Sequence, residues 1–319
     1  MIMDRPKIYS LAAGMMFLTF VMCLAPESSW AQTGRTNWKF SFGPGKVERD
    51  YRQVLPFAAY TKENGFGFVG APVELAKDPS KSSLCTSKPF LFAVDVPEGN
   101  YNVTVTLGDQ AGESTTTLKA EARRLMLERI HTARGKFETR AFTVNVRRSQ
   151  LKSGETVKLK RDEQPHMDWD EQLTLEFNDV RPCVQTLEIN RVDDAVTVYI
   201  AGDSTVTDQG KEPWSAWGQM LPRFFKRGVA IANHAESGES LKSFIGERRL
   251  EKILESIKAG DYLFIQFTHN DQKPGGSHVE PFTTYKETLK LYVDEARKRT
   301  AIPMHGRHQH RNEIGRAHV

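Results

Sequence analysis

Val198-Tyr-Ile-Ala-Gly-Asp-Ser-Thr-Val206 decides how the second half of this 319-residue chain is interpreted. Its apolar, β-branched and aromatic residues give way abruptly to the polar run Gly202–Thr205, which is typical of a buried strand entering a loop. Ligands of an open parallel sheet lie outside the carboxyl ends of its strands. Ser204 is therefore predicted at the reactive edge of a sheet, although Gly-Asp-Ser by itself also occurs in ordinary turns.

Two later apolar runs end in the same way. Val229–Ile231 leads into Asn233-His-Ala-Glu-Ser-Gly238, and Tyr262–Phe267 leads into Thr268-His-Asn-Asp271. Helical spacing of apolar residues marks three stretches around these runs, namely Trp214–Lys226, Leu250–Lys258 with Gly260 beyond its end, and Thr284–Lys298. This alternation of strands and helices predicts a parallel, doubly wound α/β sheet.

The three polar clusters contain the groups that acyl transfer requires. Such a reaction needs a nucleophile and hydrogen-bond donors aimed at the oxyanion that develops in the transition state. Ser204 is the candidate nucleophile. The candidate oxyanion donors are the backbone N–H groups of Ser204 and Gly238 and the side-chain amide of Asn270.

These clusters resemble a known family. Gly202–Ser204, Gly238 and His269–Asp271 are similar to the first three conserved blocks of the SGNH (GDSL-type) hydrolases. More narrowly, Ala201–Thr205, Trp214–Gly218 and Phe267–Lys273 resemble the rhamnogalacturonan acetylesterase branch.

The resemblance covers about residues 198–303 and implies a three-layer, flavodoxin-like SGNH domain, here placed at residues 195–303. It implies deacetylation of a pectic plant cell-wall polysaccharide through an acyl-enzyme, without cofactor or metal. Thr268 replaces a common glycine, and Glu239 stands where the branch often has arginine. These two departures bear on substrate preference rather than on the chemistry.

The family's catalytic base is a histidine oriented by an aspartate three residues earlier, both near the end of the domain. Neither is expected in this chain. Residues 304–319 are polar, and Glu313–Val319 is the translation of GAGATCGGAAGAGCACACGTC, a common sequencing adapter. A C-terminally truncated reading frame with an artefactual tail at 304–319 is therefore expected, and with it little turnover.

Several polar residues near these motifs are given structural roles. The histidines of the tail are assigned neither as base nor as metal ligands; they are His305, His308, His310 and His318. His269 is expected to shape the site. Asp203 and Asp271 are expected to form hydrogen bonds within their loops.

Residues 32–190 carry many short strand-like runs, which predict an all-β sandwich or barrel. The predicted strands lie at residues 38–42, 89–96, 101–107, 115–122, 138–146, 156–159 and 173–177. The second and third are expected to form a hairpin. Glu121–Thr132 suits a helix or a strand, and its position between strands favours a strand. Residues 191–194 are predicted to connect the two domains.

The pattern of the first domain resembles the galactose-binding-like sandwiches of carbohydrate-active enzymes. Its aromatic residues are expected in the core rather than on a sugar-binding surface; they are Trp38, Tyr51, Tyr60, Phe66, Phe68 and Trp169. Core positions are also the default for Trp214 and Trp217 of the second domain, with a substrate cleft as the alternative. Asn64–Phe68 is predicted to be a flexible loop able to contact sugar. Asp168–Glu171 is interpreted as a solvated loop rather than a calcium site.

The N-terminus is interpreted as a secretory signal peptide, residues 1–31, rather than a membrane anchor. A basic start precedes an apolar segment from Ile8 to Ala25, and Ser29-Trp-Ala31 offers a cleavage site. A secreted or periplasmic protein without a membrane partner is expected. In such a compartment Cys85 and Cys183 suit either a disulfide or two buried thiols.

Composition excludes some partners and leaves alternatives open. Hydrophobic residues make up 39% and charged residues 26% of the chain, as in soluble globular proteins. The net charge of +4 and the lack of a basic module do not suggest nucleic-acid binding. The alternatives are an esterase acting on another acetylated glycan or a lipid ester, and a non-catalytic carbohydrate-binding protein.

Overall fold

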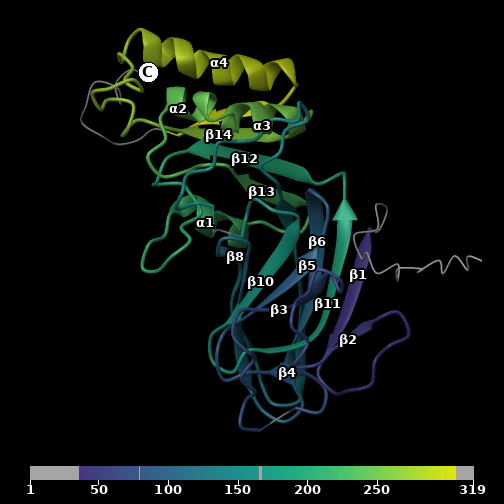
Figure 1. Ribbon diagram of the computed structural model, residues 1–319. Helices are drawn as coiled ribbons and strands as arrows, with labels where there is room; N and C mark the ends of the chain where they lie inside the picture. The colour runs from purple at the N-terminus through teal and green to yellow at the C-terminus, as the bar shows by residue number, and fades with distance from the viewer. Residues whose placement is uncertain (1–35, 79, 165–166, 307–319) are drawn as a thin grey trace, which may run out of the picture.

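The computed structural model describes residues 36–78, 80–164 and 167–306. Two sheets form a sandwich in the first half of the chain, and a third sheet with helices stands at one end of it (Figure 1). The predicted signal peptide and residues 307–319 lie outside the described residues. No described helix is long and apolar enough to cross a membrane.

The two sheets of the sandwich enclose one aromatic-rich core. One sheet has the order β2-β1-β11-β6-β9, with β4 paired to β11, and the other has the order β3-β5-β10-β7-β8. The first sheet consists of β1 (Asn37–Phe42), β2 (Arg52–Val54), β4 (Leu84–Cys85), β6 (Gly99–Asp109), β9 (Lys136–Val146) and β11 (Cys183–Val192). The second consists of β3 (Phe66–Val69), β5 (Phe90–Asp95), β7 (Ser114–Ala120), β8 (Arg124–Thr132) and β10 (Gln172–Asn178).

The sandwich core follows from the alternation in the sequence. Along β6, Tyr101, Val103, Val105 and Leu107 are buried and the residues between them are partly exposed, as expected for a strand with one face in the core. Phe42, Phe92 and Phe177 are fully buried, and the ring of Phe42 in one sheet contacts those of Phe92 and Phe177 in the other. The structure also confirms Glu121–Thr132 as mainly strand, in β8.

Some predictions for this domain are wrong. The runs at 89–96 and 101–107 do not form a hairpin, because β5 pairs with β3 and β10 while β6 pairs with β11 and β9 of the other sheet. Each strand has a buried face, but the two strands belong to opposite sheets, so their buried faces point toward each other across the core. The run at 156–159 forms only an isolated bridge between Gln150 and Thr156.

The loop predicted at Asn64–Phe68 is mostly strand. Phe66 and Phe68 belong to β3, and Phe68 is buried against Phe90 and Phe92. The core prediction holds fully for Trp38, Phe68 and Trp169, whereas Tyr51, Tyr60 and Phe66 are half-buried.

Asp168–Glu171 is likewise not simply a solvated loop. Asp168 is buried and accepts a hydrogen bond from Arg147 at 2.8 Å, and the guanidinium of Arg147 lies over the ring of the buried Trp169.

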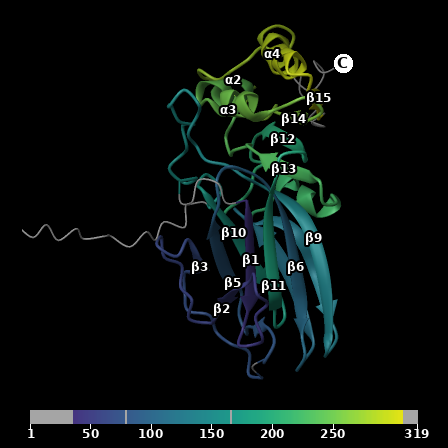
Figure 2. The same ribbon diagram turned by 90° about the vertical axis from the view of Figure 1, so that its right-hand side faces the viewer.

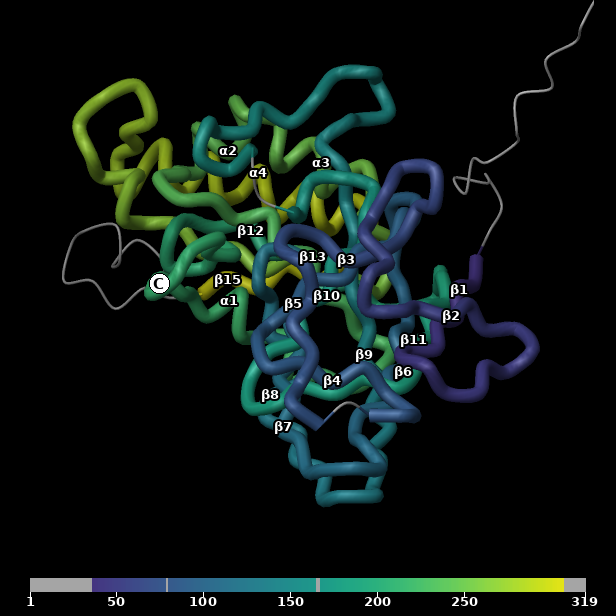
Figure 3. Tube along the Cα trace, turned by 60° about the horizontal axis from the view of Figure 1, so that its bottom comes forward, coloured from purple at the N-terminus to yellow at the C-terminus, as the bar shows by residue number. Residues whose placement is uncertain are grey.

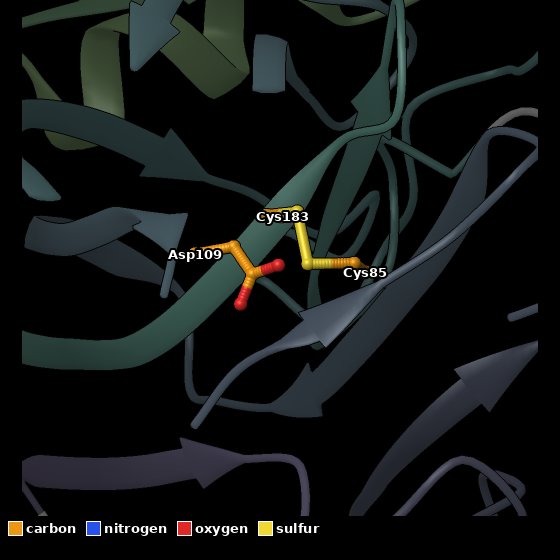
Figure 4. A group of neighbouring side chains, drawn as sticks. All are labelled: Cys85, Asp109 and Cys183. Atoms are coloured by element: carbon orange, nitrogen blue, oxygen red, sulfur yellow. A yellow bond between two sulfur atoms is a disulfide. The ribbon is translucent and has the colours of Figure 1, made fainter. Parts of the chain in front are cut away.

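A disulfide joins Cys85 and Cys183, so the bridge and not the pair of free thiols is realised. Figure 4 shows Asp109 beside it, the third member of a compact group of potential metal ligands. Sulfur atoms bonded to each other are not thiolates, and thiolate is the form in which cysteine binds metals. Asp109 is already paired with Arg181 at 2.6 Å. The group is therefore structural.

The third sheet is parallel and has the order β13-β12-β14-β15. Its strands are β12 (Val196–Gly202), β13 (Val229–Asn233), β14 (Tyr262–Gln266) and β15 (Ile302–His305). Numbered along the chain, this is the order 2-1-3-4 of a flavodoxin-like doubly wound sheet. Met304 and His305 belong to the segment 304–319 that is expected to be an artefactual tail, yet they complete β15 and pair with β14.

Helices cover both faces of this sheet (Figures 1 and 2). On one face lie α2 (Leu241–Gly246), α3 (Arg249–Ser256) and α4 (Thr284–Lys298), whose apolar side chains share a core with β12 and β14. The prediction of a helix at 284–298 is confirmed. On the other face, α1 (Trp217–Met220) and the 3-10 turn η1 (Leu221–Phe224) replace the single helix predicted at 214–226.

The sandwich and the third sheet are connected by buried polar contacts. Arg124, at the start of β8, is almost fully buried and donates hydrogen bonds to the carbonyl oxygens of Ile231 (2.9 Å) and Asn145 (3.0 Å). The amide of Gln219 in α1 donates to Ala122 O at 3.0 Å. The end of the sandwich is thereby attached to β13 and α1.

Candidate active site

The three predicted clusters lie at one edge of the parallel sheet. Ser204 follows β12, Gly238 follows β13 and Asn270 follows β14, and these strands are neighbours. The chain order reverses between β12 and β14, and such a switch point is where doubly wound sheets bind ligands. Ser204 and Asn270 stand on either side of this point.

The loop that carries Ser204 is held in place by hydrogen bonds to Asp203. Asp203 is fully buried, and its Oδ1 accepts hydrogen bonds from Thr205 N (2.9 Å) and Thr205 Oγ1 (2.8 Å). Its carbonyl oxygen accepts hydrogen bonds from Val206 N and Thr207 N. The structure therefore confirms Asp203 as a loop hydrogen-bonding partner, and it leaves Ser204 half-buried above it.

Gly238 lies exposed at the end of a loop that needs glycine there. Its φ of +81° is in the left-handed region, which residues with a Cβ avoid. The preceding Glu236 N donates to Gly202 O at 3.1 Å, which joins this loop to the end of β12. The backbone of Gly238 is thus presented close to the Ser204 loop.

Asn270 is buried, and its amide is fixed on both sides. Its Nδ2 donates to Glu239 O at 2.8 Å, and its Oδ1 accepts from Lys273 Nζ at 2.7 Å. An amide nitrogen carries two hydrogens, so one remains after the bond to Glu239. Asp271 links the same two loops through Leu241 N, which donates to its Oδ1 at 2.8 Å.

Burial raises the pKa of Asp271 to about 7, and the nearby charges of Asp203 and Glu239 add to the rise. Asp271 is therefore partly protonated at neutral pH. His234, which follows β13, is buried, and burial lowers its pKa well below the usual value, with the charge of Arg147 contributing. It is neutral and packs its ring against Trp169.

Two of the described histidines have partners away from the Ser204 loop. His234 packs its ring against Trp169, and His278 contacts the carboxylate of Glu280 at 3.0 Å. His269 is exposed beside Asn270. The described residues thus bring Ser204, Gly238 and Asn270 to one edge of the sheet.

Two tryptophans expected in the core lie at the surface instead. Trp214 is 68% exposed and Trp217 is 36% exposed. Trp217 Nε1 donates to Gln266 Oε1 at 3.1 Å, and Gln266 Nε2 donates to Thr205 Oγ1 at 2.9 Å. This chain of hydrogen bonds connects Trp217 with the residue after Ser204.

A further contributor to this edge, which no sequence motif indicates, comes from the first domain. Lys160 lies between β9 and β10, and its ammonium group contacts the carboxylate of Glu239 and the carbonyl oxygen of Ser237. Both contacts flank Gly238. The separation of 77 residues between Lys160 and Ser237 explains why no local motif reveals them.

A cavity of about 580 Å³ lies elsewhere, between the sandwich and the third sheet. Its walls include Thr197 and Asp261, which stand at the beginnings of β12 and β14, and the buried Arg147. Ser204, Gly238 and Asn270 do not line it. The cavity is therefore separate from the candidate active site.

Glu236 is buried next to Gly238, and burial raises its pKa to about 8, with the negative charge of Glu163 contributing. Between about pH 4.5 and 8 the folded protein then binds more protons than the unfolded chain. The contribution of Glu236 to the free energy of unfolding is therefore fully present below about pH 4.5. It falls by up to about 1.4 kcal/mol per pH unit as the pH rises from there to about 8.

We therefore expect Glu236→Gln to stabilise the protein at pH 8.5 and to have little effect at pH 5, because the amide is always neutral and still accepts from Ser237 N. Urea unfolding at both pH values measures the difference. Glu287→Gln on α4 is the matched control. A Glu236→Gln effect of equal size at pH 5 and pH 8.5 would contradict the expectation.

Comparison with known proteins supports the resemblance seen in the sequence. Residues 38–153 match the model of the β-agarase/YXIM esterase-like, galactose-binding domain-like family. The rhamnogalacturonan acetylesterase RhgT of Bacillus subtilis is 46% identical over 111 residues, which cover 34% of this chain and 47% of that protein. The uncharacterized esterase YxiM of the same organism is 27% identical over 286 residues, covering 83% and 67% of the two chains.

A crystal structure of YxiM covers 84% of this chain and 73% of its own, with 25% identity and a TM-score of 0.36. The probable rhamnogalacturonan acetylesterase YesY, also from Bacillus subtilis, is 41% identical over 111 residues, 34% of this chain and 51% of its own. The chain thus spans about half the length of the two acetylesterase relatives. The predicted likeness to rhamnogalacturonan acetylesterases and to galactose-binding-like domains is confirmed.

Proposed function

We propose that this chain carries the nucleophile and the oxyanion donors of a serine ester hydrolase that removes acetyl groups from rhamnogalacturonan, a pectic polysaccharide. The observation that carries the proposal is the meeting of the Ser204, Gly238 and Asn270 loops at the switch point of the parallel sheet. The names of the relatives RhgT and YesY support the substrate.

In the proposed reaction, Ser204 Oγ attacks the acetyl carbonyl carbon and loses its proton to a general base. The N–H groups of Ser204 and Gly238 and the free amide hydrogen of Asn270 stabilise the resulting oxyanion. The intermediate collapses with release of the protonated sugar hydroxyl, leaving acetyl-Ser204. Water then attacks this ester and releases acetate.

We assign the base and its orienting aspartate to residues outside the described part of the chain, as in an SGNH hydrolase whose domain continues beyond it. For the 319 residues alone we expect little or no turnover, because the base and aspartate that the SGNH resemblance implies are not assigned to any residue of this sequence. We also infer that the protein is exported, since residues 1–31 have the pattern of a signal peptide.

The proposal is tested with acetylated rhamnogalacturonan and the protein expressed from its full reading frame. We expect acetate release without shortening of the polysaccharide, because the reaction cleaves only the ester. Saponified rhamnogalacturonan is the control substrate and should yield no acetate.

Other substrates separate the alternatives. Faster release from acetylated xylan or from a lipid ester would move the substrate assignment to that class. Binding of pectin without hydrolysis of any ester would favour a carbohydrate-binding protein, for which the galactose-binding-like match of residues 38–153 is the supporting observation.

A further inference from the structure

We propose that Lys160, a residue of the sandwich domain, is a positioning residue for the oxyanion donors of the α/β domain. The two domains would then form one catalytic unit rather than an esterase with an appended binding module. This inference rests on the proposed function of Ser204, Gly238 and Asn270.

Lys160 contacts the loop after β13 at two points. Its ammonium group donates a hydrogen bond to Ser237 O and forms an ion pair with Glu239, whose side chain is fully buried. A Cβ added at Gly238 would lie only 3.5 Å from Lys160 Nζ. The ammonium group therefore touches both neighbours of Gly238 and lies beside Gly238 itself.

The same loop also orients Asn270. The backbone carbonyl oxygen of Glu239 accepts the hydrogen bond from Asn270 Nδ2. In its side chain, Oε1 contacts Lys160 and Oε2 accepts from Ser243 Oγ at 2.7 Å. A displacement of Glu239 would thus alter the backbone around Gly238 and the amide of Asn270 together. Lys160 is the cation paired with Glu239, so both donors depend on it.

Lys160 is held in place by a buried ion pair between the domains. Its backbone N–H donates to Glu163 Oε2 at 3.2 Å, and Glu163 accepts two hydrogen bonds from the buried Arg249, at 2.9 and 2.6 Å. Trp169 Nε1 donates to the same carboxylate at 2.7 Å. Figure 3 shows the segment between β9 and β10 running beside α2 and α3.

This support makes Lys160 different from the other lysines of its segment. Lys160 is only 27% exposed in its side chain, whereas Lys152 is exposed and bonds to Glu255 on α3, away from the Gly238 loop. A charged group whose backbone is fixed by a bidentate Arg–Glu pair loses little further entropy when it forms its contacts. The arrangement suits a fixed support more than a flexible substrate-binding side chain.

The test is hydrogen–deuterium exchange of the amides at residues 236–243 in the full chain, followed by mass spectrometry. We expect Lys160→Met to accelerate their exchange about tenfold or more, because a charge-assisted hydrogen bond and the partner of a buried carboxylate are lost. Lys160→Arg should retain most of the protection. Lys152→Met is the matched control and should leave these amides unchanged.

A double variant separates positioning from general destabilisation. Adding Glu239→Gln to Lys160→Met removes the unpaired buried charge and should restore part of the protection. Equal exchange at residues 236–243 in the parent, Lys160→Met and Lys152→Met proteins would overturn the inference. So would acceleration that is uniform over the whole chain, since that reports global unfolding.

The catalytic consequence is measured on the protein from the full reading frame. Lys160→Met should lower kcat for acetyl ester hydrolysis about 10- to 100-fold with KM within about twofold, as for a loss of oxyanion stabilisation. An unchanged kcat would overturn the positioning role. If the parent protein hydrolyses no ester, the proposed function fails, while the exchange experiment still decides whether Lys160 holds this loop.

Discussion

Ser204→Ala is expected to lower kcat for acetyl ester hydrolysis by a factor of at least about 10⁴, because the oxygen that would form the acyl-enzyme is removed. The half-buried Ser204 hydroxyl lies above the buried Asp203, which is engaged with Thr205 and cannot replace it. Removing one oxygen atom leaves the oxyanion donors and the substrate-binding surface in place. KM should therefore change much less than kcat.

The measurement is steady-state hydrolysis of an activated acetyl ester by the protein from the full reading frame, together with intact-mass detection of acetyl-Ser204. Ser256→Ala is the matched control, because Ser256 lies at the end of α3 and bonds only weakly to Lys252 O at 3.4 Å. If Ser204→Ala retains more than about a tenth of the parent activity, Ser204 is not the nucleophile.

Arg249→Met is expected to lower the free energy of unfolding by about 3–5 kcal/mol, the usual cost of removing one partner of a buried ion pair. Arg249 is fully buried and donates to Glu163 through both terminal nitrogens and to Glu247 through Nε at 2.9 Å. Burial acts to raise the pKa of Glu163, but the hydrogen bonds and charge of Arg249 outweigh it and hold that pKa below its usual value.

Without the guanidinium, the buried carboxylate of Glu163 remains near Glu236 without its counter-charge, and at neutral pH it must stay charged in the interior or become protonated. Glu247, which is 23% exposed, loses a partner as well. Urea unfolding measures the loss. The neighbouring Arg248→Met is the control. Its side chain is 32% exposed and pairs with Glu155 and Glu251, so its effect should stay within about 1 kcal/mol. Equal losses for the two variants would show that burial of the ion pair contributes nothing.

Much of the fold of the second domain was predictable because its signals are local. The run from Val198 to Ile200 and the run from Tyr262 to Phe267 each contain the buried strand and the polar cluster that follows it. The spacing in Thr284–Lys298 likewise defines α4 to the residue. In contrast, Trp214 has helical spacing but lies at the surface, because α1 begins only at Trp217.

The sandwich was predictable as a class but not as a topology. The alternation in β5 and β6 shows that each strand has a buried face, yet the same pattern fits two strands of one sheet or of two facing sheets. Strand pairing is decided by partners far away in the chain, such as the pairing of β6 with β11, in which Val103 faces Ile189. Phe68 was expected in the core, but its segment was predicted as a loop because the pairing of β3 with β5 is not visible in the local sequence.

The sequence by itself determined the chemistry available at the sheet edge: Ser204, Gly238 and Asn270, each placed directly after an apolar run by contiguous residues. Tertiary structure alone decided what surrounds them. Lys160 reaches Ser237 across 77 residues, and Glu163 meets Arg249 across 86. The energy of a buried charge depends on its partner and its desolvation, and both exist only once the two domains pack against each other.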